Sequence, residues 1–283
     1  DENFGYCEGN NIGIREAEGD YIIILNPDTI VESNWIEELI SAYNKFGEGL
    51  YQPKHLSLNK KTVYMSAGNM LNIFGFGYAR EKGNKDENQF NKIEEIGYAS
   101  GTCLFTSSAV LKKVGLFDPF IFLYHDDLDL GWRASQLGIK SYYVPTSLIY
   151  HAESYSLKWN AEKFYWLERN RKYCILTHYS KQTYSKIFPT LLAVDFFVWM
   201  FYLTKGFLWS KIRAELDIIK NRKAIKTKYE ELESKKIVSD KELITKFSDS
   251  LHVPSNVTGK NTNSIFNSVI RRLSKSAKKS LVN

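Results

Sequence analysis

The stretch YIIILNPDT, from Tyr21 to Thr29, carries the clearest information about the fold. Its first five residues are apolar or aromatic and include three β-branched isoleucines. Such a run favours a strand buried on both faces, as in a parallel sheet. Pro27 has no N–H to offer a sheet ladder and therefore ends the strand. The stretch predicts a central strand that delivers Asn26 and Asp28 to the carboxyl edge of the sheet, where open α/β sheets bind ligands.

Strand-like and helix-like segments alternate around this stretch up to about residue 150. Helices are predicted over residues 12–19, 34–46 (with Ser33 as N-cap), 108–115 and 126–138, and strands over 98–107, 140–145 and 147–151. The polar, glycine-rich residues 60–96 are interpreted as an excursion over the sheet. This alternation predicts an α/β fold with a mostly parallel sheet and flanking helices.

After about residue 156 the sequence becomes helical in pattern. The segment Ile187–Leu203 is 17 residues long and strongly apolar and aromatic, at the lower limit for a span of about 20 residues. It contains Pro189 and Asp195, and an aspartate at the centre of a spanning helix costs roughly 2.5–3.5 kcal/mol. We expect an interfacial, membrane-associating helix first, a helix packed on the protein second, and a single transmembrane segment at 187–203 third.

Charge is unevenly distributed along the 283 residues, whose net charge is +6. From Lys205 to the end there are 18 Lys/Arg and 8 Asp/Glu, so residues 1–204 carry a net −4. A basic C-terminal part suits an anionic membrane surface, while a solvated helical face is the alternative. We expect 250–283 to be a flexible basic tail, and no nucleic acid partner, because the tail contains no recognisable binding module.

The three cysteines, Cys7, Cys103 and Cys174, are far apart and form no CxxC or CxxH pair. Neither a disulfide framework nor a zinc site is therefore expected, and a reducing compartment such as the cytoplasm fits best.

A second chemical signal is the segment FLYHDDLDLGWR, which places Asp126, Asp127 and Asp129 in the first turn of a predicted helix. The helix dipole and an i,i+4 pair with Arg133 account for one or two of these acids. Three acids within four residues repel one another and raise one another's pKa, a cost that is usually tolerated where function uses it. One of these carboxylates could deprotonate a hydroxyl nucleophile.

Asp28 itself has two interpretations. The tripeptide N-P-D is good turn chemistry, and alone the turn interpretation is the stronger one. Carboxylate and amide oxygens at a strand end also suit Mg²⁺ or Mn²⁺, which usually hold substrate phosphates as well. His151 ends another strand-like run, SLIYH, and a neutral imidazole can complete a Mn²⁺ sphere with carboxylates.

These segments together resemble a known family. The series NFGYCEGNNIGI, YIIILNPDT, YASGTCLFTSSAVLKKVGLFDPF, FLYHDDLDLGWR and VPTSLIYHAES, in this order, is similar to the family 2 glycosyltransferases, in particular the rhamnosyltransferase-like subset. The resemblance covers about residues 3–175. It implies a Rossmann-like GT-A fold and inverting transfer of a sugar from a nucleotide diphosphate sugar to an acceptor hydroxyl, within surface polysaccharide or glycan synthesis.

The resemblance also implies site residues. Asp127 matches the general base, and Asp126 matches the first member of the family's Glu-Asp pair. Asp28 and His151 match positions that bind Mn²⁺ or Mg²⁺, and Asn26 replaces the first aspartate of a D-x-D motif. Gly101 and Thr102 match a segment that lines the acceptor and donor sugar. Asn11 matches an asparagine of the opening motif and is expected to contact the donor or, equally, to cap a helix.

The expected organisation has three parts: a GT-A catalytic domain at 1–180 that lacks the family's first strand, a helical extension at 181–249 and the tail at 250–283. The expected partners are a nucleotide diphosphate sugar donor and a glycan or lipid-linked acceptor, met at the cytoplasmic face of the cell membrane. The alternative from another class is a non-catalytic, membrane-attached carbohydrate-binding or scaffold protein.

Overall fold

The computed structural model describes residues 3–152, 160–251 and 260–282. They form two compact units. The sheet unit comprises residues 1–70 and 78–155, and the helical unit comprises residues 71–77 and 156–283. The division follows the change of sequence character near residue 156 and differs from the expected boundary at 180, because the helix that begins at Ala161 belongs with the helices that follow it.

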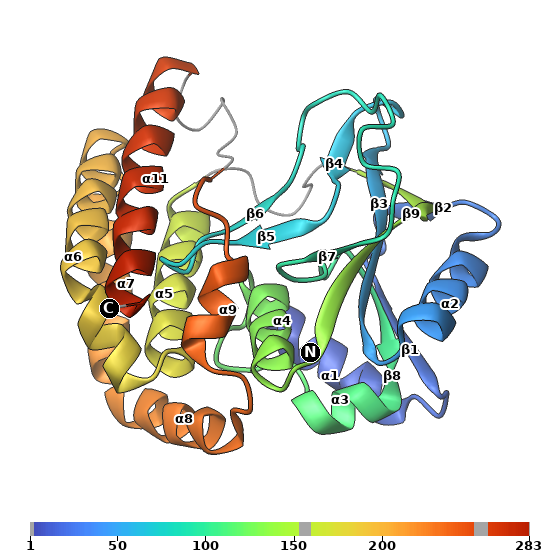
Figure 1. The fold of residues 1–283 in the computed structure, drawn as a ribbon, viewed down its shortest axis with the longest axis horizontal. Helices are drawn as coiled ribbons and strands as arrows, with labels where there is room; N and C mark the ends of the chain where they lie inside the picture. Colours follow the sequence, from blue (N-terminus) through green and yellow to red (C-terminus); the bar gives the residue numbers. More distant parts are fainter. Residues whose placement is uncertain (1–2, 153–159, 252–259, 283) are drawn as a thin grey trace. The chain divides into compact units, whose positions relative to one another are not determined.

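The sheet unit is built around one mixed sheet (Figure 1). Its described strands are β1 (Tyr21–Leu25), β2 (Thr29–Val31), β3 (Gly49–Ser57), β4 (Tyr64–Ser66), β7 (Glu94–Ile96), β8 (Cys103–Ser107) and β9 (Lys140–His151). The main order is β1-β8-β3-β9-β2, with β4 beside β3 and β7 beside β9. A separate hairpin joins β5 (Asn69–Leu71) to β6 (Gly77–Ala79).

The expectation of a mostly parallel sheet is wrong in detail. Among the described strands β3 and β9 are parallel, whereas β1–β8, β3–β8, β2–β9, β3–β4 and β7–β9 are antiparallel. The strand β1 is also the outer strand of the described order, with Tyr21 and Leu25 about 40% exposed. A continuous apolar run reports burial and not strand direction, so the sequence could not distinguish these arrangements.

The link between β1 and β2 requires a strongly curved sheet. Only Asn26–Asp28 separate the two strands, although they lie at opposite ends of the order. Four strand spacings of about 4.8 Å would separate them by about 19 Å in a flat sheet. Four Cα–Cα steps reach at most about 14–15 Å. The sheet therefore curls at this edge and brings the ends of β1, β8, β9 and β2 together.

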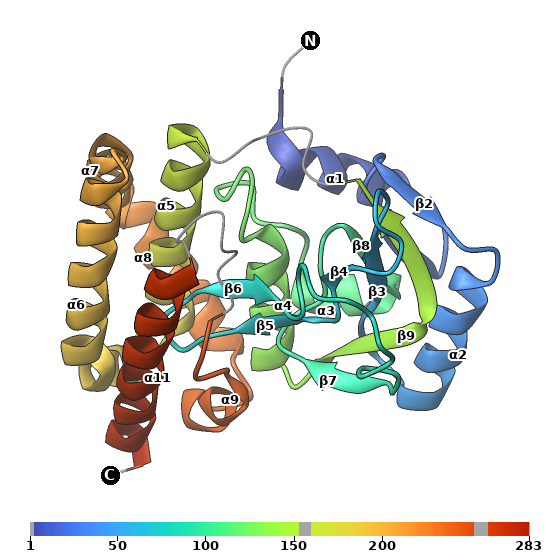
Figure 2. The ribbon, with the colours of Figure 1, turned by 90° about the horizontal axis from the view of Figure 1, so that it is seen from above.

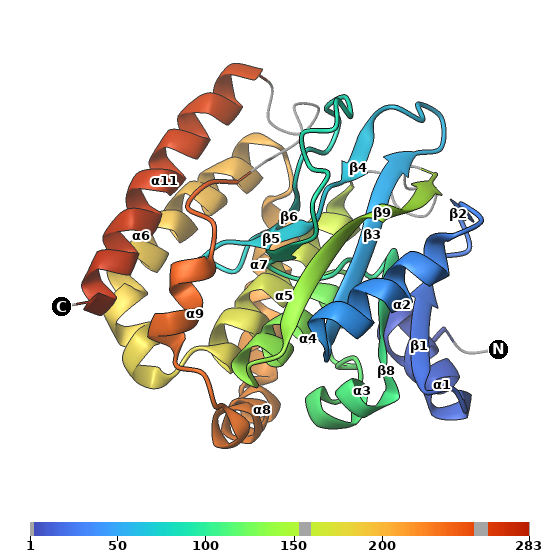
Figure 3. The ribbon, with the colours of Figure 1, turned by 45° about the vertical axis from the view of Figure 1, so that its right-hand side comes forward.

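Four helices flank the sheet: α1 (Gly5–Glu16), α2 (Trp35–Phe46), α3 (Ser108–Val114) and α4 (Asp126–Gln136). Helix α2 covers one face and α4 the other (Figures 1 and 3). Trp35 and Leu39 of α2 pack into a buried cluster with Tyr51 and Phe105 of the sheet. The i, i+3, i+4 spacing in the sequence predicted an apolar stripe beginning at Ile36. Leu39 is buried as predicted, but Ile36 is exposed and Trp35 is buried in its place. Ser33 is not the N-cap; Asn34 takes that position without a side-chain cap bond.

The first helix lies earlier than predicted. It was expected over residues 12–19 and is observed at Gly5–Glu16. The glycine-rich start is helical because the carbonyl oxygen of Phe122 accepts hydrogen bonds from the first-turn amides of Tyr6 and Cys7, at 2.8 and 3.3 Å. These contacts come from a segment more than a hundred residues away, so local propensity could not indicate them.

The helical unit consists of α5 (Ala161–His178), α6 (Lys181–Thr204), α7 (Leu208–Lys220), α8 (Arg222–Lys235), α9 (Asp240–Lys246) and α11 (Lys260–Val282), together with residues 71–77 (Figures 1 and 2). The 71–77 segment is fixed here by side chains of the unit. The hydroxyl of Tyr179 donates to the Ile73 carbonyl at 2.7 Å, and Asn72 Nδ2 donates to the Ser248 carbonyl at 2.7 Å.

The expected flexible tail is wrong for residues 260–282, which form α11 and pack against α6. Ile270, Ala277 and Leu281 of this helix are buried. Their spacing makes a narrow apolar stripe within a segment rich in Ser, Asn and Lys, and the overall composition obscured that stripe. Residues 252–259, which the prediction also assigned to the tail, lie outside the described part of the chain.

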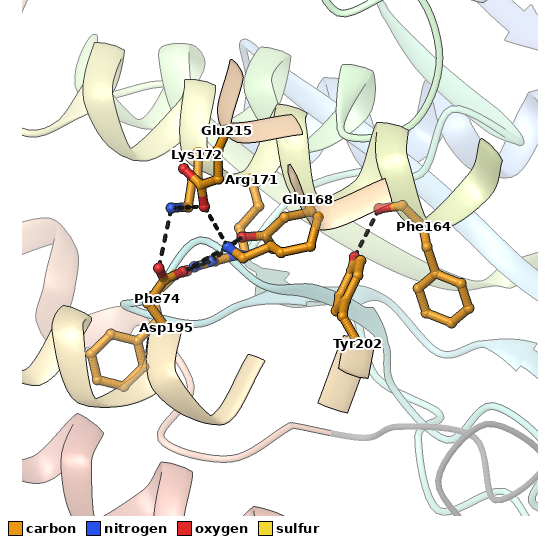
Figure 4. Close-up of polar contacts among 9 residues, drawn as sticks. Phe74, Phe164, Glu168, Arg171, Lys172, Asp195, Tyr202 and Glu215 are labelled. Atoms are coloured by element: carbon orange, nitrogen blue, oxygen red, sulfur yellow. Dashed lines mark hydrogen bonds and ion pairs between the residues drawn. The ribbon is translucent and has the colours of Figure 1, made fainter. Parts of the chain in front are cut away.

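Asp195, the acid within the apolar helix α6, belongs to a network of ion pairs (Figure 4). Its carboxylate lies 2.9 Å from Lys211 Nζ of α7 and 3.2 Å from both Arg171 and Lys172 of α5. Glu168 bonds Lys211 and Arg171 in the same network. Burial of these charges is offset by pairing, which holds the pKa of Glu168 at about 2.

Candidate functional site

The turn between β1 and β2 carries Asn26, Pro27 and Asp28. The backbone N–H of Asn26 donates to the Thr102 carbonyl at 3.0 Å, which extends the β1–β8 ladder by one bond. The hydroxyl of Thr29 donates to the Asn26 carbonyl at 2.6 Å and closes the turn. The turn interpretation of N-P-D is therefore confirmed, and Pro27 ends the strand as predicted.

Asp28 and His151 come together at the end of this turn. His151 Nε2 lies 3.2 Å from Asp28 Oδ1. The pairing of β2 with β9 sets Thr29 opposite His151, and the Ala152 amide donates to the Asp28 carbonyl at 2.9 Å. Both side chains keep some contact with solvent, at 32% exposure for Asp28 and 14% for His151. The sequence predicted both as metal ligands, and they are close enough to share one ion.

Asp127 begins the other half of the site, in the first turn of α4. Its two oxygens accept hydrogen bonds from the amides of Gly101, at 3.0 Å, and Leu128, at 2.8 Å. Burial raises the pKa of Asp127 to about 6, although the two N–H donors act in the opposite direction. The carboxylate is thus fixed in orientation and has a proton affinity suited to a general base near neutral pH.

Asp126 is more deeply buried than its neighbour. Burial, followed by the charge of Asp127, raises the pKa of Asp126 well above its ordinary value. The two neighbouring carboxyls titrate as a coupled pair, and burial disfavours the charged form of both.

Tyr6 is a site residue that sequence reasoning missed. Its hydroxyl donates to the Gly101 carbonyl at 2.6 Å. Burial and then the charges of Asp126 and Asp127 raise the pKa of Tyr6 well above 10. A side chain on Gly101 would lie 2.7 Å from this hydroxyl and 3.3 Å from Asp126 Oδ2, which explains why the position is a glycine. The NFGYCEGN motif contained Tyr6, but nothing local indicated a contact to residue 101.

The loop before α4 is strained. Phe122, Tyr124 and His125 all have positive φ angles, of 64°, 62° and 64°. None is glycine, so each costs of order 1–3 kcal/mol, and such residues cluster at active sites and ligand clamps. These residues directly precede Asp126 and Asp127, the first two residues of α4. Local sequence does not indicate this strain, because FLYH contains no glycine or asparagine.

Asp129, the third acid of the cluster, is structural. It is fully buried and pairs with Arg133 at 2.8 Å, as the i,i+4 spacing predicted. Arg133 also donates to the Val114 carbonyl at 2.9 Å, so the pair attaches α4 to the end of α3.

Asn11 is not a helix cap, because it lies within α1, whose N-cap position is Phe4. Its buried amide instead exchanges two hydrogen bonds with the backbone of Phe117, donating at 2.9 Å and accepting at 3.0 Å. These bonds account for the residue without a donor sugar, and the predicted donor contact stays a prediction.

The structure thus connects the predicted residues at one edge of the sheet. The Asn26 amide is bonded to the Thr102 carbonyl, and the neighbouring Gly101 amide is bonded to Asp127. Asp28, in the turn that begins at Asn26, lies beside His151. One oxygen and one nitrogen donor fit Mn²⁺ or Mg²⁺ that retains open positions for phosphate oxygens. The carboxylates of Glu168, Asp195 and Glu215 in the helical unit also lie close together, but Lys211 pairs with all three, so they do not resemble a metal centre.

Comparison with known proteins bears on the family and the fold. Residues 5–174 match the model of the family "Glycosyltransferase like family 2". The chain is 25% identical over 142 residues to the low-salt glycan biosynthesis hexosyltransferase Agl10 of Haloferax volcanii, which covers 48% of this chain and 45% of that protein. It is 27% identical over 148 residues to the N-acetylglucosaminyl-diphospho-decaprenol L-rhamnosyltransferase of Mycobacterium tuberculosis, covering 48% of each.

Among solved structures the fold is similar to that of GalNAc-T7 crystallised with UDP, GalNAc and Mn²⁺, with a TM-score of 0.51 and 15% identity over 67% of this chain and 38% of that one. The chain spans about half the length of the curated relatives it matches. The fold is the α/β, GT-A-like arrangement of a mixed sheet with flanking helices, followed by a helical region. With more than half of its length matched by the family model, the chain belongs to glycosyltransferase family 2.

Proposed function

We propose that this protein transfers a sugar from a nucleotide diphosphate sugar to an acceptor hydroxyl. Family membership supports the reaction class, and the observation that carries the proposal is the environment of Asp127. This carboxylate is oriented by the amides of Gly101 and Leu128, has a pKa of about 6, and lies on the same sheet edge as the Asp28–His151 pair.

In the proposed mechanism Asp127 accepts the proton of the acceptor hydroxyl as that oxygen attacks the anomeric carbon. The bond from this carbon to the diphosphate breaks on the opposite face in the same displacement, so the anomeric configuration inverts. No carboxylate nucleophile is needed, since one displacement completes the transfer. Asp126 lies beside it, where burial and the charge of Asp127 raise its pKa and disfavour a second negative charge.

Asp28 and His151 would hold a divalent cation, Mn²⁺ or Mg²⁺. When bound, such an ion neutralises charge on the departing diphosphate. Asn26 lies in the same turn as Asp28, its backbone N–H bonded to the Thr102 carbonyl, and is proposed as a donor contact together with Gly101 and Thr102.

We place the reaction at the cytoplasmic face of the cell membrane, with a lipid-linked or glycan acceptor in surface polysaccharide synthesis. The name of the mycobacterial relative specifies a diphospho-decaprenol acceptor. Among the described helices α6 is long and apolar enough to cross a bilayer by length and composition, and 22% of its most apolar window is buried. Its outward residues include Phe188, Leu192 and Phe196, at 45–61% exposure. Because Asp195 is paired with α5 and α7, we favour a helix that lies in the head-group region.

The deciding experiment uses Asp127→Asn in the full-length protein, with a panel of UDP-, dTDP- and GDP-sugars in the presence of Mn²⁺. The variant should lose at least about 1,000-fold in kcat because its general base is gone, while donor affinity changes less than about threefold. Equal losses of donor binding and turnover would contradict the base role. A wild-type protein that binds glycans but neither binds nor consumes any nucleotide sugar would instead be the non-catalytic carbohydrate-binding protein.

A further inference from the structure

The helical unit contains a groove that the proposed transfer reaction does not use. It lies among α5, α6, α7 and α8 and has a volume of about 570 Å³. This volume is in the range of sites for small organic ligands. Leu176, Ile218 and Ile225 supply an aliphatic lining, and Tyr184 and Tyr229 add aromatic surface.

Three cationic side chains line the same groove: Lys181, Arg222 and Lys226. All three residues are exposed, and none of the described residues that line the groove carries a carboxylate. Lys181 Nζ lies 6.0 Å from the centre of the Tyr229 ring. The ion pair that Lys226 makes with Glu230, at 3.7 Å, joins two largely exposed side chains and is weak. Arg222 is the first residue of α8, where the helix dipole adds positive potential.

A second, smaller hollow of about 250 Å³ continues the apolar lining. It shares Leu176, Tyr184 and Ile218 with the groove. It is also lined by Phe188 and Leu192, which belong to the exposed face of α6, and on another side by charged residues that pair with one another: Arg171, Lys172, Asp195 and Glu215. The apolar lining therefore extends from the three cations to the surface that we propose to meet the membrane.

A cationic rim above an extended apolar lining matches an anionic amphiphile. We propose that the groove binds one anionic membrane lipid, with its phosphate held by Lys181, Arg222 and Lys226 and its chain lying over Leu176 and Ile218. The proposal rests on the membrane association proposed above, but it assigns a binding site to residues of the helical unit that have no part in donor chemistry.

The lining distinguishes a lipid from a free phosphate. The three cations are solvent-exposed, so a small anion would exchange one hydrated environment for another and gain little. A lipid chain gains about 25 cal/mol for each Å² of apolar surface that it buries against the groove. The charge and the chain therefore act together, and each alone should bind weakly.

The direct test is calorimetric titration of the full chain with short-chain phosphatidylglycerol, below its micelle concentration. We expect saturable binding of one lipid per chain. Short-chain phosphatidylcholine, which carries no net charge, should bind at least about tenfold more weakly, and inorganic phosphate should give no saturation. Equal affinity for phosphatidylcholine would show that the cations do not select the ligand. Equal affinity for inorganic phosphate would show that the groove is not a lipid site.

A matched pair of variants tests the location. Arg222→Gln with Lys226→Gln removes two charges that line the groove, and Lys220→Gln with Lys223→Gln removes two exposed charges of the same helices outside its lining. The first pair should weaken phosphatidylglycerol binding by at least about tenfold, because each neutralised cation near the phosphate is worth about fivefold. The control pair should change it by less than about threefold. Equal losses in the two pairs would mean general surface attraction and would exclude the groove.

The outcome is separable from that of the proposed transferase activity. Lipid binding is measured without donor, and Mn²⁺-dependent nucleotide-sugar binding is measured without lipid. The groove variants should keep the latter, since Arg222 and Lys226 belong to α8 of the helical unit. A diazirine carried in the lipid chain should label peptides of α5, α7 and α8. Labelling confined to the exposed face of α6 would contradict the groove.

Discussion

The backbone amide of Gly101 donates a hydrogen bond of 3.0 Å to Asp127 Oδ2, and this bond connects the turn before β8 to the start of α4. Twenty-six residues separate the two positions in sequence. The bond orients the carboxylate and lowers its pKa, while burial raises it more strongly, so that Asp127 ends near pKa 6. Several expectations depend on this balance.

The activity should depend on pH through Asp127. Because burial raises the pKa of its carboxyl to about 6, the base is deprotonated above that pH and protonated below it. With a water-soluble acceptor, kcat/KM should be level above about pH 7 and fall about tenfold for each unit below pH 6. A profile that stays level down to pH 4.5 would exclude Asp127 as the titrating base. Donor binding measured over the same range is the control for loss of the folded state.

Replacing Asp126 should stabilise the protein at neutral pH. Burial raises the folded-state pKa of this carboxyl, so ionisation costs the folded state more than the unfolded state. Asp126→Asn should therefore raise the free energy of unfolding at pH 7 by about 1–2 kcal/mol while activity falls. The gain should vanish below about pH 4, where the carboxyl is protonated in both states. Urea unfolding at the two pH values measures this, and a loss of stability at pH 7 would contradict it.

Gly101→Ala tests the close approach at the site. A methyl group there would lie 2.7 Å from the Tyr6 hydroxyl oxygen and 3.3 Å from Asp126 Oδ2. The substitution should displace the 101–102 turn and lower kcat at least about tenfold. Adding Tyr6→Phe removes the nearest clashing atom and should recover part of the loss. A double variant no more active than Gly101→Ala alone would show that the clash with the Tyr6 hydroxyl is not the cause.

Metal dependence should require both Asp28 and His151. Their donor atoms are 3.2 Å apart, so each variant removes one of two adjacent ligands. Asp28→Ala or His151→Ala should weaken Mn²⁺-dependent donor binding by about 10–100-fold, and chelation of the metal should weaken the wild type similarly. The exposed Asp20→Asn variant serves as the control for a general loss of negative charge. Unchanged Mn²⁺ dependence in both variants would remove the pair as the metal site.

Asn11→Ala should destabilise the fold more than it affects the chemistry. It leaves the buried N–H and C=O of Phe117 without their hydrogen-bond partner, at a cost of about 2–3 kcal/mol. Urea unfolding should report this loss, with KM for the donor changed less than about threefold in the folded fraction. A raised KM with unchanged stability would instead support the donor contact that the sequence motif implied.

The site was partly readable from the sequence because its residues lie at element ends. YIIIL predicted a strand, Pro27 its end, and the acidic first turn of α4 followed from FLYHDDLDLGWR. The i,i+4 spacing indicated the pair of Asp129 with Arg133. No local pattern indicated the bond from the Gly101 amide to Asp127, which depends on how the chain packs around α4.

Sequence by itself determined the α/β class, most element positions and the residues that could bind metal or accept a proton. These properties depend on short-range periodicity and on side-chain chemistry. The tertiary structure decided the mixed strand directions of the sheet, the β2–β9 pairing that brings Asp28 to His151, the position of Tyr6 and the helix at 260–282. Each of these depends on contacts between residues that are distant in the chain, and a short stretch of sequence does not show those contacts.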